Sequence, residues 1–349
     1  SLVFLAYLFK SIIILIVYVT LKSHYSYAVS GALTLTLLLM LPIEYKDLIT
    51  VLLLTLGIYF YYKKKLWGLL FLSLLPLSNA VFLYILPVVL VIYFLFKKNN
   101  FKKSIITLFI LLIPSMIWMG RNYSTVNQFS ITGRASEVLS IRAEYSTNNF
   151  DQIRAGYIFY TPARPFIFGA VQGKFWSYVT DSGSDVIYNR SDSQSSYRMA
   201  KNLTGVVGSR LESKDFESKS YIEQQQILNT VSIDLIRENA PQHLLLSTVF
   251  GYRGMFPSIN FDFIEFYSFP ESISLLIKEI FSFLRLFFIP YGLVKSIINL
   301  LNKKTSLCSL LLIILWGFFA SLTHFIPRYA TYLLIPAVLF VANIDKEEV

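Results

Sequence analysis

The sequence predicts an all-α polytopic membrane protein with about nine apolar segments and one large mixed extracytoplasmic insertion. Of its 349 residues, 55% are hydrophobic and only 15% are charged, whereas about a quarter of the residues of a soluble domain are charged. The mean hydropathy of +0.56 agrees with that balance. Because a membrane helix needs about 20 apolar residues, this composition excludes a soluble enzyme and a protein with a single anchor.

The apolar runs fall into two groups that flank a polar middle region. We expect them to form spans over residues 2–21, 27–41, 48–62, 66–79, 81–96, 104–119, 281–301, 306–322 and 329–343. Several runs are shorter than an ideal span and would tilt little, extend into the interface or be partly re-entrant. Three domains are therefore predicted: an N-terminal transmembrane bundle (1–119), an extracytoplasmic or interfacial domain (120–280) and a C-terminal transmembrane bundle (281–349).

The net charge of +10 lies mostly in short connections between apolar runs. Four connections hold ten lysines and no acidic residue: Lys22, Lys63, Lys64, Lys65, Lys97, Lys98, Lys102, Lys103, Lys303 and Lys304. The region 120–280 holds 15 basic and 16 acidic residues, a net of −1. Lys and Arg in short loops stay cytoplasmic, so the charge predicts topology and does not require nucleic acid as a partner. Residues 42–47, 120–280 and 323–328 would then share the outer side.

The middle region changes character along its length. Residues 157–180 combine aromatic residues, Gly and Arg, which is typical of backbone at a headgroup interface, and residues 181–220 are Ser-rich and charged, as in an exposed loop. From Asp215 to Asn239 apolar residues recur at helical spacing, and Pro241 follows as a stop. We therefore expect an amphipathic helix that packs through Tyr221, Leu228, Val231 and Leu235.

Two carboxylates lie three residues apart in the short outer connection Pro42-Ile43-Glu44-Tyr45-Lys46-Asp47. Carboxylates close to hydrocarbon are costly and often functional. On one interpretation Glu44 or Asp47 faces an outer cavity, where it binds a cation or deprotonates an acceptor hydroxyl. On the other, both only stabilise the start of the following helix. The spacing alone does not choose between them.

Two arginines lie at outer ends of predicted spans, against the usual bias of basic residues toward the cytoplasm. Arg121 closes the sixth run, and its planar guanidinium suits paired phosphate oxygens; the alternative is an aromatic belt with one snorkelling arginine. Arg328 enters the last run beside Tyr329, with His324 four residues earlier. An arginine at membrane depth normally has a partner or a ligand. His324 is either a proton carrier or a structural residue.

Three short motifs occur in a defined order, namely PIEYKD at 42–47, WMGRNY at 118–123 and PRYATYLLIP at 327–336. In this order and on this side of the membrane they resemble the C-type (GT-C) membrane glycosyltransferases. The chain is similar to the bacterial relatives of protein O-mannosyltransferases that use dolichyl-phosphate mannose, and to those of the lipid A aminoarabinose transferase. The segment IDLIRENAP at 233–241 and the large outer insertion are also similar. The resemblance spans most of the chain.

The resemblance implies a hexosyl- or pentosyltransferase that moves a sugar from a polyprenyl-phosphate-linked donor to an acceptor hydroxyl on the extracytoplasmic face. The acceptor would be a glycan, lipid or protein of the cell envelope, and the location a bacterial inner or plasma membrane. It implies catalytic Glu44 and Asp47, and donor-phosphate contacts from Arg121, Arg328, Tyr329 and His324. No resident cofactor is implied. A divalent cation, where one is used, would be held by Glu44 or Asp47.

The chain departs from the family pattern at its N-terminus. The family's principal catalytic Asp lies in the first outer loop, between the first and second helices, and this chain resembles the family from the second helix onward. An outward-to-inward first span also requires that a segment upstream of it has crossed the membrane. We therefore expect that an N-terminal segment precedes residue 1 and carries the principal catalytic Asp.

Two other classes of function compete with this interpretation. An O-antigen-type polysaccharide polymerase or ligase is also polytopic and has arginines in a large outer loop; the acidic turn at 42–47 favours a hydroxyl-activating transferase instead. A transporter of lipid-linked sugars would show charges at mid-membrane depth or duplicated halves. Lys10 is the one deeply placed charge of the early spans, and no duplicated halves are seen. The single cysteine, Cys308, excludes a disulfide framework within the chain.

Overall fold

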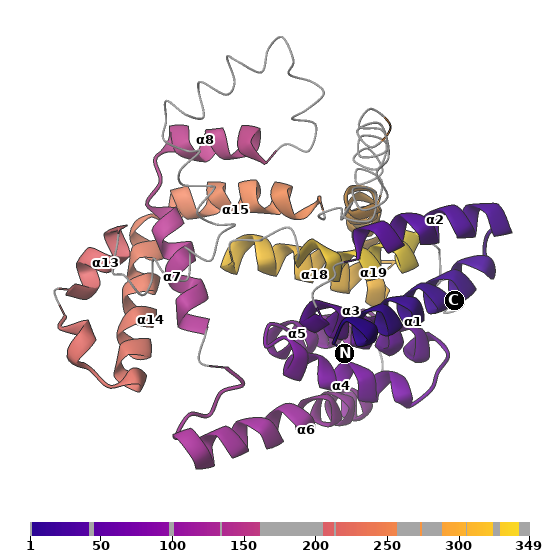
Figure 1. The fold of residues 1–349 in the computed structure, drawn as a ribbon, viewed down its shortest axis with the longest axis horizontal. Coiled ribbons are helices and arrows are strands. Elements are labelled where there is room, and N and C mark those ends of the chain that lie inside the picture. Colours follow the sequence, from indigo (N-terminus) through magenta and orange to yellow (C-terminus); the bar gives the residue numbers. More distant parts are fainter. Residues whose placement is uncertain are drawn as a thin grey trace, which may run out of the picture. The chain divides into compact units, whose positions relative to one another are not determined.

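In the described residues the protein is all-helical and has no strand (Figure 1). The computed structural model describes residues 2–41, 45–97, 101–132, 135–160, 205–212, 214–256, 273, 288–304, 306–323 and 329–341. The helices are α1 (Leu2–Lys22), α2 (Tyr27–Met40), α3 (Tyr45–Tyr62), α4 (Trp67–Ser78), α5 (Phe82–Lys97), α6 (Phe101–Val126), α7 (Ala135–Ser146), α8 (Phe150–Phe159), α13 (Gly205–Glu212), α14 (Tyr221–Glu238), α15 (Ala240–Gly254), α18 (Leu307–Leu322) and α19 (Ala330–Val341). A further apolar helix covers Phe288–Leu301.

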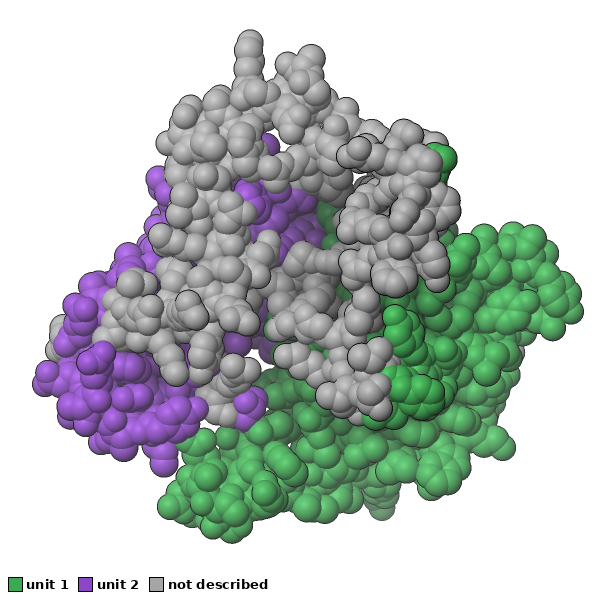
Figure 2. Space-filling model, in the orientation of Figure 1, with its two compact units in different colours: residues 1–131, 255–316, 327–349 green, residues 132–254, 317–326 purple. Residues whose placement is uncertain are grey.

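The chain divides into two compact units (Figure 2). Unit 1 comprises residues 1–131, 255–316 and 327–349, and unit 2 comprises residues 132–254 and 317–326. Unit 1 therefore combines α1–α6 with the Phe288–Leu301 helix, the first part of α18, and α19, so segments from the two ends of the sequence belong to one compact unit. The predicted sidedness of residues 120–280 stays a prediction.

Two helices of the described residues are long and apolar enough to cross a membrane. They cover Phe4–Lys22 in α1 and Ile105–Val126 in α6, and only 17% of the α6 window is buried. Seven shorter apolar helices accompany them, each of 10 to 17 residues. This supports membrane association, while the nine predicted crossings stay a prediction.

Several hydroxyl groups in the apolar helices are satisfied within their own helix. A hydroxyl that bonds the carbonyl one turn earlier needs no partner from another element, which suits a helix surrounded by apolar groups. The bonds are Thr20 to Ile16 O (2.8 Å), Thr34 to Ser30 O (2.6 Å) and Thr55 to Val51 O (2.7 Å). These hydroxyls can therefore be buried without specifying which helices pack together.

Helices α3 and α4 form a close antiparallel pair because small residues face the contact. The chain turns between them at Lys64, which has a positive φ of 52°. A Cβ added at Gly68 would lie 2.4 Å from Tyr61 N, and one added at Gly57 would lie 2.7 Å from Leu72 Cδ2. Only a residue without a side chain fits at Gly68, because the opposing atoms belong to the backbone.

Unit 2 has its own apolar core, formed by α7, α13 and α14. Its buried members are Ala143, Val207, Leu211, Leu228, Val231 and Leu235. The predicted amphipathic helix over 215–239 is confirmed in its central part. It begins at Tyr221 because Ser220 and Glu223 form a capping box there, and the prediction that Tyr221 packs in the core is wrong, since its side chain is 51% exposed.

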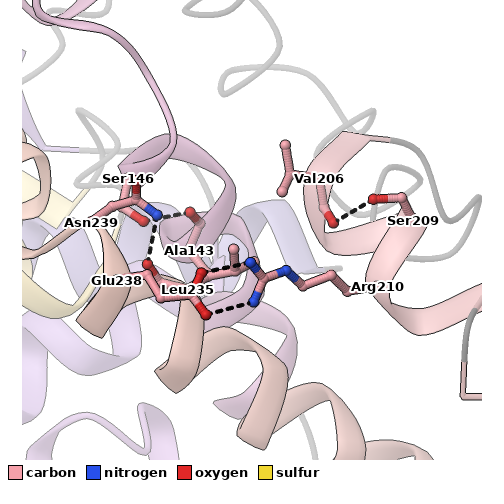
Figure 3. Close-up of polar contacts among 8 residues, drawn as sticks. All are labelled: Ala143, Ser146, Val206, Ser209, Arg210, Leu235, Glu238 and Asn239. Carbon is pink, nitrogen blue, oxygen red and sulfur yellow. Dashed lines mark hydrogen bonds and ion pairs between the residues drawn. The ribbon is translucent and has the colours of Figure 1, made fainter.

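Polar contacts join α13 to its neighbours in unit 2 (Figure 3). Arg210 on α13 makes a two-pronged ion pair with Glu238 on α14, at 2.9 and 2.5 Å. The Arg210 hydrogen bond holds the pKa of the Glu238 carboxyl below its ordinary value, although an exposed pair of this kind adds little stability. At the start of α13, Glu144 accepts from Val206 N (3.1 Å) and Val207 N (2.9 Å). A carboxylate thus satisfies the free amides of the helix N-terminus.

The α3–α4 contact predicts that Gly68→Ala destabilises unit 1. The new methyl would overlap the backbone of α3, and overpacking of this kind costs about 1–3 kcal/mol. Thermal unfolding of the purified protein in detergent should therefore show a lower midpoint for this variant.

The matched control is Gly31→Ala in α2, because a Cβ there meets no atom within 4 Å. This control should leave the midpoint unchanged or raise it slightly, since alanine reduces the freedom of the unfolded chain. An equal loss in both variants would mean that the close approach of α3 and α4 is not what Gly68 serves.

Candidate functional site

A buried carboxylate in the first turn of α3 meets a buried phenol in the first turn of α19. Asp47 is 4% exposed and Tyr332 is 1% exposed. The Tyr332 hydroxyl donates a short hydrogen bond to Asp47 Oδ1, joining residues that lie 285 positions apart in the sequence. An unpaired carboxylate at this depth would be strongly unfavourable, so this bond links the position of α3 to that of α19.

Asn79, the residue that directly follows α4 and caps its C-terminus, joins the same contact. Its Nδ2 donates to the Tyr332 hydroxyl at 3.3 Å, and its Oδ1 accepts from Val81 N at 3.2 Å. The backbone amide therefore fixes which side of the Asn79 amide faces Tyr332, because the oxygen is already engaged. Three helix ends, those of α3, α4 and α19, meet at one polar cluster, which we call the Asp47 cluster (Asp47, Asn79 and Tyr332).

Aromatic rings enclose the phenol of Tyr332. Phe82, at the start of α5, packs edge-on with its ring centroid 6.1 Å away, and Tyr329 stacks nearly parallel at 6.0 Å. One turn into α3, Thr50 donates to Ser78 Oγ across to α4 at 3.1 Å. Surrounding apolar groups exclude water, and a low local dielectric strengthens the hydrogen bonds inside.

The Asp47 cluster contains groups that can receive a proton and hold it in a fixed place. Asp47 also lies at the N-terminal end of α3, where the helix dipole favours a negative charge. A carboxylate of this kind can act as a base toward a hydroxyl that reaches it. The same carboxylate links α3 to α19 through its hydrogen bond with Tyr332.

The predicted site residues fall into three groups in the structure. Asp47 and Tyr329 are brought together, since both contact Tyr332. Arg121 lies on an exposed part of α6, with its guanidinium 4.9 Å from the Trp118 ring centroid. Glu44, His324 and Arg328 lie outside the described residues.

The sequence interpretation missed Asn79 and Tyr332. Asn79 follows an apolar run directly and precedes another, and a polar amide in such a position is a signal for a helix end or a buried contact. Tyr332 lies three residues after Tyr329, in the motif that was already singled out. Neither signal indicates which residue is the partner.

The side chain of Lys10 on α1 contacts the C-terminal end of α2. Lys10 is partly buried, and its Nζ donates to Leu41 O, the carbonyl that directly follows α2, at 3.3 Å. The deeply placed charge of α1 therefore has a partner at a helix C-terminus, where cations are favourable.

No group of three or more His, Cys, Asp and Glu side chains that could hold a metal occurs in the part of the chain that the structure describes. Glu44, one of the two residues predicted to hold a cation, is outside that part. The prediction that Glu44 or Asp47 holds a divalent cation therefore stays a prediction.

Comparison of the chain with protein-family models, with curated proteins and with solved structures found no match in any of the three. The GT-C resemblance therefore stands on the three short motifs and their order. What the structure adds is the contact between the first and the last of these motifs, at Asp47 and Tyr332.

A second polar cluster lies in unit 2, between α7 and α15. Arg142 is fully buried and donates to His243 O (3.1 Å) and Ser247 Oγ (2.6 Å), with its guanidinium 4.9 Å from the Phe250 ring centroid. Burial, reinforced by the Arg142 charge, lowers the pKa of His243 to about 4. Both effects disfavour a second positive charge at this position.

His243 predicts that unit 2 loses stability on acidification. Its imidazole has an ordinary pKa of 6.5 and a folded-state pKa of about 4, so the unfolded chain binds the proton first. The neutral His243 side chain therefore costs no stability above pH 6.5, and the free energy of unfolding of unit 2 falls as the pH drops from about 6.5 to about 4. Unfolding midpoints measured across this range should fall in the wild type and fall less in His243→Gln.

The control for this experiment is His24→Gln, which removes an exposed imidazole from unit 1. The pH dependence should persist in that variant. Identical pH profiles for the wild type and His243→Gln would show that this histidine does not govern the acid sensitivity.

Proposed function

We propose that this protein is a polytopic membrane glycosyltransferase of the C type. It transfers a sugar from a polyprenyl-phosphate-linked donor to an acceptor hydroxyl on the extracytoplasmic face of a bacterial membrane. The acceptor is a glycan, lipid or protein of the cell envelope. The observation that carries the proposal is the contact between the PIEYKD turn and the PRYATY helix through Asp47 and Tyr332.

The arrangement of charges in unit 1 supports this orientation. The 18-residue helix α3 is about 27 Å long, and it separates Asp47 from the exposed lysines Lys63–Lys65 at its other end. Helix α19 likewise has Tyr332 in its first turn and ends at Val341, whose carbonyl accepts a 3.0 Å hydrogen bond from the Tyr25 hydroxyl, three residues after Lys22. If the lysines are cytoplasmic, the Asp47 cluster is at the outer end.

The predicted residues then divide into an acidic and a cationic group with different chemical tasks. Asp47 or Glu44 takes the proton of the acceptor hydroxyl as its oxygen attacks the anomeric carbon. The bond from that carbon to the donor phosphate breaks, its electron pair passes to the phosphate oxygen, and the configuration inverts. Arg121 and Arg328, with Tyr329 and His324, would stabilise the phosphate as it gains negative charge.

The proposal predicts sugar transfer by the full-length protein and its loss in two variants. With a polyprenyl-phosphate sugar donor in detergent, Asp47→Asn should lower turnover about 10²- to 10⁴-fold, because a general base is removed. Arg328→Ala should lower it by a similar factor, because the leaving phosphate loses a cation. Release of polyprenyl phosphate and labelling of the acceptor are the two quantities to measure.

Asp215→Asn and Lys63→Ala are the matched controls, since both residues are exposed and lie outside the proposed site. Both should retain wild-type turnover. Full activity of Arg328→Ala and Asp47→Asn in folded protein would overturn the assignment. Processive polymerisation from a pyrophosphate donor would favour the polymerase interpretation, and donor movement without transfer would favour a transporter.

A further inference from the structure

The Asp47 cluster is a hydrogen-bond chain with one allowed direction. Val81 N donates to Asn79 Oδ1 at 3.2 Å, so the amide turns its Nδ2 toward Tyr332. An amide nitrogen can only donate, which means that the Tyr332 oxygen accepts from Asn79. The phenolic proton must then be the one that lies in the bond to Asp47.

Packing also restricts the phenol. Tyr332 is 1% exposed, and the rings of Phe82 and Tyr329 pack against its ring. A tyrosine held in this way has little freedom to rotate away from Asp47. The side chain of Asp47 is therefore held by a donor that belongs to α19 and is itself oriented by the end of α4.

We propose that Tyr332 is a positioning residue for Asp47, and that Asn79 orients Tyr332 in turn. This inference rests on the proposed function. In it, Tyr332 touches neither the sugar nor the phosphate; it holds Oδ1 so that the carboxylate faces the acceptor hydroxyl in the geometry needed for proton transfer. A misplacement of about 1 Å in such a group can cost about 100-fold in rate.

The donor that orients Tyr332 can be exchanged for an acceptor at position 79. Asn79→Asp keeps an oxygen for Val81 N and replaces the donating Nδ2 with an accepting oxygen. Tyr332 would then be drawn between two carboxylates and would donate to Asp47 less often. Tyr332→Phe removes the donor entirely and leaves the ring in place.

The experiment measures kcat and KM for a polyprenyl-phosphate sugar in the full-length protein, per folded molecule. Tyr332→Phe and Asn79→Asp should each lower kcat about 10- to 100-fold and change the donor KM less than about twofold. In an Asp47→Asn background, Tyr332→Phe should cause no further fall in kcat, because it acts through that carboxylate. The matched control is Tyr291→Phe, at a 53% exposed tyrosine of unit 1, which should keep the wild-type kcat.

The possible outcomes separate this inference from the proposed function. If the wild type is active and Tyr332→Phe keeps its kcat, the positioning role is wrong while the transferase proposal stands. The same holds if Tyr332→Phe lowers only the folded fraction, or lowers kcat by the same factor in the Asp47→Asn background, since a purely structural tie gives those results. If folded wild-type protein transfers no sugar from any polyprenyl-phosphate or pyrophosphate donor, the proposed function fails and this role fails with it.

Discussion

The hydrogen bond between Tyr332 and Asp47 imposes the constraint on which the arrangement of unit 1 depends. A carboxylate that is 4% exposed must be satisfied by the protein, because water cannot reach it in quantity. Its donor comes from the opposite end of the sequence, so the first helices and the last helix must form one core. The alternative, an unpaired buried charge, would destabilise the fold by several kcal/mol.

The apolar helices could be predicted from the sequence because their composition is decided locally. The run predicted at 48–62 is α3, and the run at 66–79 is α4, each to within about three residues at either end. The run at 104–119 is different, since α6 continues to Val126. Hydropathy falls at Arg121, but the helix continues past this polar residue to Val126.

The site could be predicted only in part, because its decisive contact is not local. The acidic turn and the PRYATY motif each stood out as charged or polar segments beside apolar runs. No periodicity relates Asp47 to Tyr332, and the amide of Asn79 gives no sign of its partner. In unit 2 the same limit applies to the buried Arg142. Its hydrogen-bond acceptors, His243 O and Ser247 Oγ on α15, lie 101 and 105 positions later in the sequence. Long-range pairs of this kind are set by the tertiary fold, which a single sequence does not display.

Polar groups in unit 1 form hydrogen bonds either within one helix or between helices. This difference distinguishes residues with a structural role from candidates for function. The hydroxyls of Thr20, Thr34 and Thr55 bond to carbonyls one turn earlier in their own helices. These bonds therefore do not determine which helices pack together. The groups of the Asp47 cluster bond between helices, and each bond depends on the others for its direction. Such a network has a cost in desolvation that three apolar side chains would avoid. A packed core alone does not require such a network, and the proposed chemical task of the fixed carboxylate would account for it.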